Sequence, residues 1–186
     1  MLKSLKRPDS IRRGSVEATK SLAGAVILRQ FRSRPTAGMK PWPDFDSNGD
    51  LPVDVYEATL EETIERFGGG TLQRRLVAQR LRRIYSLAVS TGQLARFIIF
   101  GSFVTSKSAP NDIDIFMIMK DTFDLNQESG EAAIIFYHRP AQNWEGASIF
   151  WIRQMASIGG AEEAVKDWQV KRDGSRRGIV EVIAND

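Results

Sequence analysis

The chain has 186 residues, of which 42% are hydrophobic and 26% charged, a composition typical of one soluble globular domain and unlike that of disordered or fibrous proteins. It contains no cysteine, which excludes disulfides and thiolate chemistry, and its one histidine, His138, excludes a zinc site built from several histidines. The formal net charge is +3 at pH 7, and with these ligand types excluded any metal would be held by oxygen atoms.

The basic excess lies in the first 50 residues, which hold ten Lys and Arg against five Asp and Glu, whereas residues 51–186 hold sixteen against eighteen. Proline and glycine interrupt this N-terminal arm, so we expect residues 1–50 to be an irregular, poorly ordered extension, with 16–31 as its one helix candidate. The folded domain is predicted to span 51–186. A solvated tail and an arm that contacts nucleic acid or an acidic partner are both compatible with this charge, and the absence of interleaved aromatic residues favours the tail.

Two helices are predicted at the start of the domain. Thr59 with Glu62 forms a capping-box pattern, and apolar residues then recur at helical spacing until the glycines 68–70. Thr71 opens a second helix, which Gly92 ends.

The second helix has a predicted apolar stripe and an arginine-rich remainder. The stripe consists of Leu72, Leu76, Leu81, Tyr85 and Ala88. The arginines largely off it are Arg74, Arg75, Arg80, Arg82 and Arg83. We interpret them as a solvated face, with a phosphate-rich partner as the alternative.

The rest of the domain contains short strand-like runs. Residues 96–100 and 113–119 predict two buried strands on either side of a turn-rich insert at 105–111. The remaining expected elements are a helix or strand at 132–137, a strand at 147–152, a helix at 161–168, a turn at 172–175 and a closing strand at 178–183. Together they predict an α+β domain with a small mixed sheet. All apolar runs are far shorter than the roughly 20 residues that span a bilayer, and no secretory signal pattern is present, so we expect a cytoplasmic protein without a membrane span.

A strip of four residues, Gly101, Ser102, Asp112 and Asp114, contains the candidate functional groups. Gly101-Ser102 at a strand end lets the backbone approach phosphates closely, with free amides and one hydroxyl as donors. Nine residues separate Ser102 from Asp112. Asp112 and Asp114 stand two apart, so their carboxylates project from the same side of the next strand. Two like charges this close favour a bound divalent cation. The strip therefore predicts a site for a metal–triphosphate complex.

These residues resemble the nucleotidyltransferase superfamily of the DNA polymerase β type, especially its minimal bacterial members. Further matching segments indicate one uncharacterised bacterial family of that superfamily over roughly residues 51–183: Leu51-Pro52, Tyr56-Glu57-Ala58-Thr59, Glu65-Arg66-Phe67-Gly68, Gly101-Ser102-Phe103-Val104-Thr105, Pro110-Asn111-Asp112-Ile113-Asp114, Trp168-Gln169, Arg172-Asp173-Gly174 and Gly178-Ile179-Val180. The resemblance implies a nucleotidyltransferase-like sheet with helices packed on it. It also implies Mg²⁺ or Mn²⁺ as cofactor and a nucleoside triphosphate, with ATP expected, as ligand.

The resemblance further implies a third carboxylate from a neighbouring strand, and here the sequence departs from the pattern. In the segment Gly146-Ala147-Ser148-Ile149-Phe150, Ser148 stands where the family has an acid. A serine cannot bind a second metal with charge or act as a base at neutral pH. Glu145 is the candidate substitute, although strand alternation puts it on the face opposite Ser148.

Two functions follow from the resemblance. The first is an enzyme in which Asp112 and Asp114 bind the metal, Gly101 and Ser102 hold the phosphates, and a nucleoside monophosphate passes to a protein or RNA hydroxyl, as in toxin–antitoxin or defence modules. The second is a catalytically degenerate regulatory protein of the same fold, which Ser148 favours.

Several other side chains carry weaker indications. Lys107 is a candidate phosphate contact, or an exposed turn lysine. The arginines 172, 176 and 177 suggest a phosphate clamp or a solubilising turn. We expect Trp144, Trp151 and Trp168 to pack in the core rather than to stack on a nucleobase. The sequence leaves the oligomeric state open.

Overall fold

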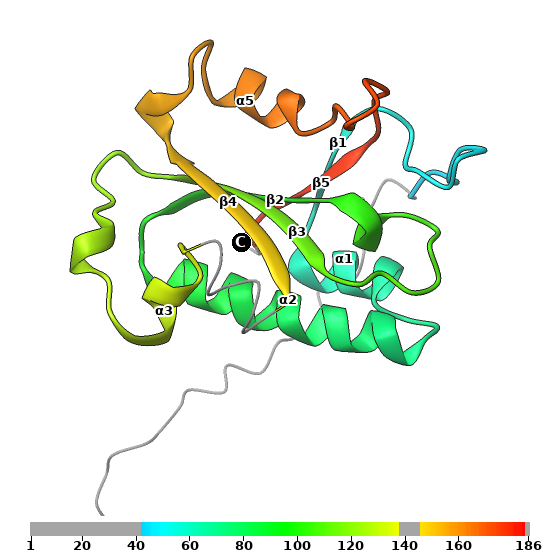
Figure 1. The fold of residues 1–186 in the computed structure, drawn as a ribbon, viewed down its shortest axis with the longest axis horizontal. Coiled ribbons are helices and arrows are strands. Elements are labelled where there is room, and N and C mark those ends of the chain that lie inside the picture. Colours follow the sequence, from blue (N-terminus) through cyan, green and yellow to red (C-terminus); the bar gives the residue numbers. More distant parts are fainter. Residues whose placement is uncertain (1–41, 138–145, 185–186) are drawn as a thin grey trace, which may run out of the picture. The chain divides into compact units, whose positions relative to one another are not determined.

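The computed structural model describes residues 42–137 and 146–184, which form an α+β domain built on a five-stranded mixed sheet (Figure 1). The strands are β1 (Val55–Ala58), β2 (Leu94–Phe100), β3 (Ile113–Met119), β4 (Ala147–Arg153) and β5 (Ile179–Val182). The helices are α1 (Leu60–Phe67), α2 (Leu72–Ser90), α3 (Gly130–Ile134) and α5 (Ala161–Asp167), and short 3₁₀ turns occupy Gly101–Val104, Leu125–Gln127 and Gln154–Ala156.

The strand order is β1-β5-β2-β3-β4, with parallel pairs at both edges and antiparallel pairs in the middle. β1 runs parallel to β5 and β3 parallel to β4, while β2 lies antiparallel to both β5 and β3. The predicted strands at 96–100 and 113–119 are confirmed as β2 and β3, and the two pair with each other. β1 was not predicted from the sequence. It consists of four residues, and it completes the sheet only through the distant β5.

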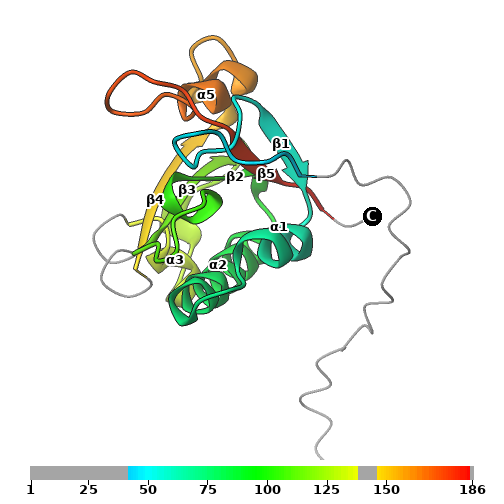
Figure 2. The ribbon, with the colours of Figure 1, turned by 90° about the vertical axis from the view of Figure 1, so that its right-hand side faces the viewer.

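The sheet is covered on both faces, α1 and α2 lying on one side and α5 on the other (Figures 1 and 2). Alternation along β3 sends Ile113, Ile115 and Met117 into the larger core on the α1–α2 side. Phe116 and Ile118 face the smaller cluster beneath α5. Side chains of β3 at the even positions therefore share a face with α5.

The two predicted N-terminal helices are confirmed, together with their caps. The Thr59 hydroxyl accepts from the Glu62 amide at 3.2 Å, and the Glu62 carboxylate accepts from the Thr59 amide at 2.7 Å. The Thr71 hydroxyl accepts from the Arg74 amide at 3.2 Å, which starts α2. These local bonds satisfy amides that the first helical turn leaves open.

The predicted stripe of α2 is confirmed in its second half and wrong in its first. Leu81 and Ala88 are buried and Tyr85 packs against the core, whereas Leu72 and Leu76 lie on another side of the helix. Leu72 is 66% and Leu76 40% exposed, so neither belongs to the core. The buried face instead consists of Arg74, Val77, Ala78, Leu81, Ile84 and Ala88. Arg74 lies three residues before Val77 and so shares that face, which corrects its assignment to a solvated surface.

Residues 42–50, which the sequence assigns to the N-terminal arm, pack on the domain. The rings of Trp42 and Phe67 meet edge to face with centroids 5.1 Å apart. The buried Asp50 carboxylate pairs with Lys171 Nζ at 2.8 Å. Residues 42–50 therefore belong to the folded domain rather than to the arm, because Trp42 supplies an aromatic contact and Asp50 a buried ion pair. Residues 1–41 lie outside the described part of the chain.

The later elements follow the sequence closely. The ambiguous segment at 132–137 contains the end of helix α3, and the strand, helix and closing strand predicted after it are β4, α5 and β5. The predicted turn at 172–175 is present as a turn. No helix among the described residues is long and apolar enough to cross a membrane.

Candidate functional site

The backbone leaves β2 through a glycine that no other residue replaces without strain. Gly101 has φ +77°, the left-handed region in which a side chain is disfavoured. A Cβ atom at Gly101 would overlap the Asp114 carboxylate, which lies against the glycine. Gly101 is therefore required both by the turn and by the close approach of an acid from β3.

The sheet brings the two acids of the strip to the α5 face. In the β2–β3 ladder Asp114 is the partner of Phe100, the last residue before Gly101. Its neighbours Ile113 and Ile115 point into the opposite core, so Asp114 points to the α5 side. Asp112 precedes the strand and acts electrostatically on Asp114. Gly101, Asp112 and Asp114 are thus brought together, as the strip predicts.

Asp114 ionises with difficulty in this setting. Burial, and then the neighbouring charge of Asp112, raise the pKa of Asp114 from 3.8 to about 6. Arg177, the Ser148 hydroxyl and Arg172 act in the opposite direction and limit the rise. The two carboxylates form a partly buried acidic pair, an arrangement that a cation would stabilise.

Ser148 lies where the sequence analysis places a third acid. The β3–β4 register pairs Asp114 with Ser148 directly, and parallel partners project from the same face. The serine hydroxyl lies beside the Asp114 carboxylate and favours its charged form. Among the described residues no group of three or more acidic or histidine side chains is placed to hold a metal. Glu145, the candidate substitute, and His138 and Trp144 lie outside the described residues.

Arg74 fixes the loop that carries Gly101 and Ser102. Its guanidinium is buried and donates to four main-chain carbonyls. The acceptors are Phe67 at 2.6 Å, Phe103 at 3.0 Å, and Thr105 and Lys107 at 2.5 Å each. Burial lowers the pKa of Arg74. One side chain of α2 therefore holds the end of α1 and three points of the loop between β2 and β3.

The remaining loop residues differ in exposure. Ser102 is half-buried, and its carbonyl accepts from the Thr105 hydroxyl at 2.8 Å. Lys107 is exposed, and the loop is bound through the Lys107 carbonyl rather than its ammonium group. Ser102 thus belongs to the structured turn beside the acids, whereas only the backbone of Lys107 is fixed.

Arginines from the turn before β5 approach the acidic pair. The guanidinium carbon of Arg177 lies 5.7 Å from the centroid of the Phe100 ring, and Phe100 pairs with Asp114. Both Arg177 and Arg172 act electrostatically on Asp114. Arg176 donates to the Gln169 side chain at 3.1 Å and does not take part. The site combines two acids with two nearby arginines.

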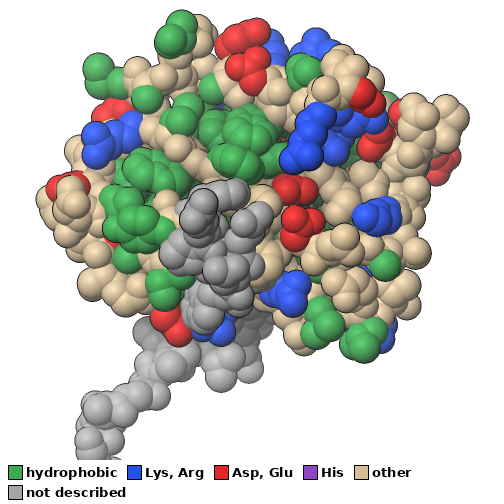
Figure 3. Space-filling model, viewed as in Figure 1, with side chains coloured by type: hydrophobic (Ala, Val, Ile, Leu, Met, Phe, Trp, Pro, Cys, Tyr) green, Lys and Arg blue, Asp and Glu red, His purple; other side chains and the backbone are tan. Residues whose placement is uncertain are grey.

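An aromatic cluster on the same face adjoins this group. The Trp168 ring lies 4.6 Å from Phe100, 4.9 Å from Phe116 and 4.8 Å from Phe150, measured between centroids. Trp151 packs on the other side of β4, where its indole donates to the Phe136 carbonyl at 3.1 Å. Packing roles are therefore confirmed for Trp151 and Trp168. Figure 3 shows Asp and Glu side chains beside Lys and Arg side chains, next to a hydrophobic patch.

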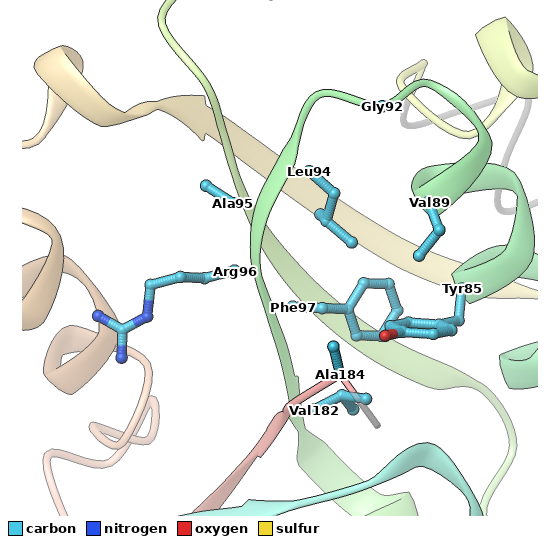
Figure 4. Close-up of a pocket in the computed structure, with 9 residues that line it drawn as sticks. All are labelled: Tyr85, Val89, Gly92, Leu94, Ala95, Arg96, Phe97, Val182 and Ala184. Atoms are coloured by element: carbon cyan, nitrogen blue, oxygen red, sulfur yellow. The ribbon is translucent and has the colours of Figure 1, made fainter. Parts of the chain in front are cut away.

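A cavity of about 310 Å³ lies elsewhere, between α2 and the sheet (Figure 4). Its lining is mainly apolar, with Tyr85, Leu94, Phe97 and Val182 among the residues that surround it. Arg96 points away from it in Figure 4, toward Glu181, whose carboxylate it contacts at 2.5 Å. The cavity offers no acid or cation for catalysis, so the acidic pair remains the candidate site.

The role of Arg74 in holding the loop between β2 and β3 was not predicted from the sequence. Arg74 lies seven residues before Leu81, two helical turns away on the same side of α2, so the predicted stripe itself indicates a buried position for Arg74. No sequence signal identifies the carbonyls that it binds. They lie seven to thirty-three residues away along the chain.

A family model described as a family of unknown function (DUF6932) matches residues 43–183. The match covers most of the chain, so the protein belongs to this family. No curated protein and no solved structure matches the chain. The matched stretch begins near the first described residue, in agreement with the packing of residues 42–50 on the domain.

Proposed function

We propose that this protein binds a nucleoside triphosphate, with ATP as the expected nucleotide, as its Mg²⁺ or Mn²⁺ complex. We further propose that it transfers the nucleoside monophosphate to a hydroxyl of a protein or RNA acceptor. The observation that carries the proposal is the contact between Gly101 and the Asp114 carboxylate. A turn that requires glycine, beside a partly buried acidic pair, is the arrangement expected of a nucleotidyltransferase-like site, in line with the resemblance of the strip.

The residues present fit one divalent cation. Asp112 and Asp114 supply carboxylate oxygens, the ligands that Mg²⁺ prefers. Burial, and then the charge of Asp112, raise the pKa of Asp114, and a bound cation would offset both effects. A second cation is not supported by the described residues, because Ser148 occupies the position of the third acid.

Each residue of the strip has a defined role in the proposed reaction. The backbone amides around Gly101-Ser102 and the Ser102 hydroxyl bind the phosphate chain, and Asp112 and Asp114 would hold the metal. The metal, when bound, would supply electrostatic stabilisation of the phosphoryl charge. The acceptor oxygen bonds to the α-phosphorus, the bond from that phosphorus to the bridging oxygen breaks, pyrophosphate leaves, and the acceptor's proton passes to solvent.

Transfer of label from [α-³²P]ATP tests this proposal. The full chain, incubated with Mg²⁺ and either a partner protein encoded beside it or total RNA, should label the acceptor. The double variant Asp112→Asn/Asp114→Asn should abolish labelling, while Asp124→Asn, which changes an acid bonded only to nearby Asn126 and Gln127, should retain it. Label transfer that persists in the double variant would refute the assignment of these acids.

The second candidate is a catalytically degenerate regulatory protein of the same fold, and Ser148 is the observation that favours it. Beside Asp114, a serine supplies neither the charge nor the basicity of a carboxylate. In this candidate the site binds the nucleotide, and the bound state controls a partner of a toxin–antitoxin or defence module. Cytoplasmic placement is part of both proposals.

Ser148→Asp separates the two candidates. Label transfer that arises only in Ser148→Asp would indicate a degenerate site, because the restored acid completes the metal site. Strong transfer by the unmodified chain would indicate an active enzyme in which another group replaces the third acid. Ser86→Asp is the matched control, since Ser86 is exposed on α2, which covers the face of the sheet opposite α5 (Figure 1).

A further inference from the structure

Hydrogen bonds fix the turn before β5 in place. The Arg177 amide donates to the Gln169 carbonyl at 2.9 Å, and the Gly178 amide donates to the Leu51 carbonyl at 2.8 Å. A Cβ atom at Gly178 would overlap the Pro52 carbonyl, so the backbone passes very close to the segment before β1. The backbone of Arg177 is therefore anchored on both sides, and its side chain extends from a rigid base.

The Arg177 side chain is half-buried over the site and incompletely bonded. Its guanidinium carbon lies 5.7 Å from the Phe100 ring centroid, so the cation rests against an aromatic ring that adjoins Gly101. Its Nε atom is buried and has no hydrogen-bond partner within the described residues. Buried donors in folded proteins are nearly always satisfied, so a missing acceptor at this atom calls for an explanation.

The arginines and the acids of the site lie near one another but form no ion pair with one another among the described residues. Arg177 and Arg172 act on Asp114, yet none of the ion pairs between described residues joins either arginine to Asp112 or Asp114. Where described residues do form ion pairs, the atoms lie 2.5–4.0 Å apart, with Lys171 and Asp50 at 2.8 Å. A ligand placed between the two groups must offer a cation to the acids and anionic oxygens to the arginines. A divalent metal bound to a polyphosphate has both.

We propose that Arg177 binds the phosphate chain, so that metal and polyphosphate bind as one complex rather than separately. This inference rests on the proposed function and adds to it the residue that recognises the phosphate chain of the metal–polyphosphate. The guanidinium suits the role because it is planar, permanently charged and able to donate in parallel to two phosphate oxygens. Arg176 is excluded because its side chain is bonded to Gln169.

Calorimetric titration of the full chain with Mg²⁺ alone, magnesium pyrophosphate, MgATP and MgAMP tests the inference. The unmodified protein should bind magnesium pyrophosphate and MgATP, and MgAMP more weakly. Arg177→Met should weaken binding of magnesium pyrophosphate and MgATP by about 10-fold to 100-fold, the usual effect of losing a charge-assisted hydrogen bond. Its affinity for Mg²⁺ alone should be unchanged or increased, because a repelling cation is removed. A variant that is only structurally damaged would bind all four ligands more weakly.

Two further variants keep the result interpretable. Arg176→Met is the matched control and should bind like the unmodified protein. If Arg177→Met does not fold, Arg177→Lys retains the charge and the aliphatic stem, and it should bind magnesium pyrophosphate several-fold more weakly because the planar fork is lost. Unmodified affinity for magnesium pyrophosphate in the folded Arg177 variants would overturn the inference while the proposed function stands. Failure of the unmodified chain to bind any magnesium nucleotide would overturn both.

Discussion

Replacing Arg74 by methionine should destabilise the domain strongly. The substitution retains an unbranched apolar stem of similar length but removes all four donor contacts to the carbonyls of Phe67, Phe103, Thr105 and Lys107. The first two carbonyls are bonded in buried surroundings, and the other two in partly buried ones, where water can replace part of the loss.

The expected magnitude follows from these four contacts. A buried carbonyl left without a donor costs about 1–3 kcal/mol, and the half-buried pair adds a smaller amount because solvent reaches it. Relief of the burial that lowers the pKa of Arg74 offsets part of this loss. We therefore expect Arg74→Met to lower the free energy of unfolding by about 3–4 kcal/mol, a large fraction of the stability of a typical domain.

Urea unfolding followed by tryptophan fluorescence measures this change. Arg75→Met is the matched control, because Arg75 is the adjacent exposed residue on the same helix, and it should change the free energy of unfolding by less than about 0.5 kcal/mol. A loss below about 1 kcal/mol for Arg74→Met, or equal losses for the two variants, would show that Arg74 does not hold the loop.

Three further predictions concern the site and the strands that support it. Gly101→Ala should destabilise the domain by more than 1 kcal/mol in thermal unfolding, because its φ of +77° is strained for alanine and its Cβ meets Asp114; an unchanged melting temperature would contradict this geometry. The pKa of Asp114 is about 6 in the fold against 3.8 as its reference value, so its contribution to stability is present below pH 4 and is lost as pH rises through 6. Asp114→Asn should therefore unfold at a higher urea concentration than the unmodified protein at pH 7, and its stability should depend less on pH. A difference in urea midpoint between variant and unmodified protein that is the same at pH 7 and at pH 4 would refute the raised pKa. Glu181→Gln should cost about 2–3 kcal/mol, because the mostly buried Arg96 guanidinium loses the mostly buried one of its two ionic partners. Glu162→Gln, whose side chain is 78% exposed, should cost less than about 1 kcal/mol in the same assay.

Local sequence signals account for the elements that the sequence predicts well. The capping pair Thr59 and Glu62 acts over three residues, so the start of α1 is visible without knowledge of the fold. The β-branched run at 113–119 identifies a buried strand for the same reason. Alternation along that strand also places Asp112 and Asp114 on one face, and this part of the candidate site follows from the sequence alone.

Features that depend on distant partners could not be predicted. The face of α2 that is buried depends on where the sheet lies, and the prediction that Leu72 and Leu76 belong to it left Arg74 on the solvated side. β1 forms only because β5 provides a parallel partner more than one hundred residues later. The position of Arg177 over Phe100 likewise depends on strand order, which the sequence does not contain.

The proposed binding of a magnesium–nucleotide complex by Asp112 and Asp114 is tested most directly by the shift of the melting temperature that MgATP causes. A ligand that binds only the folded state at 100 times its Kd stabilises that state by about 2.7 kcal/mol, so MgATP should raise the melting temperature by several degrees. ATP with EDTA should raise it far less, and Asp112→Asn/Asp114→Asn should abolish the magnesium-dependent part. No shift in the unmodified protein with any magnesium nucleotide, or an equal shift in the double variant, would contradict the claim.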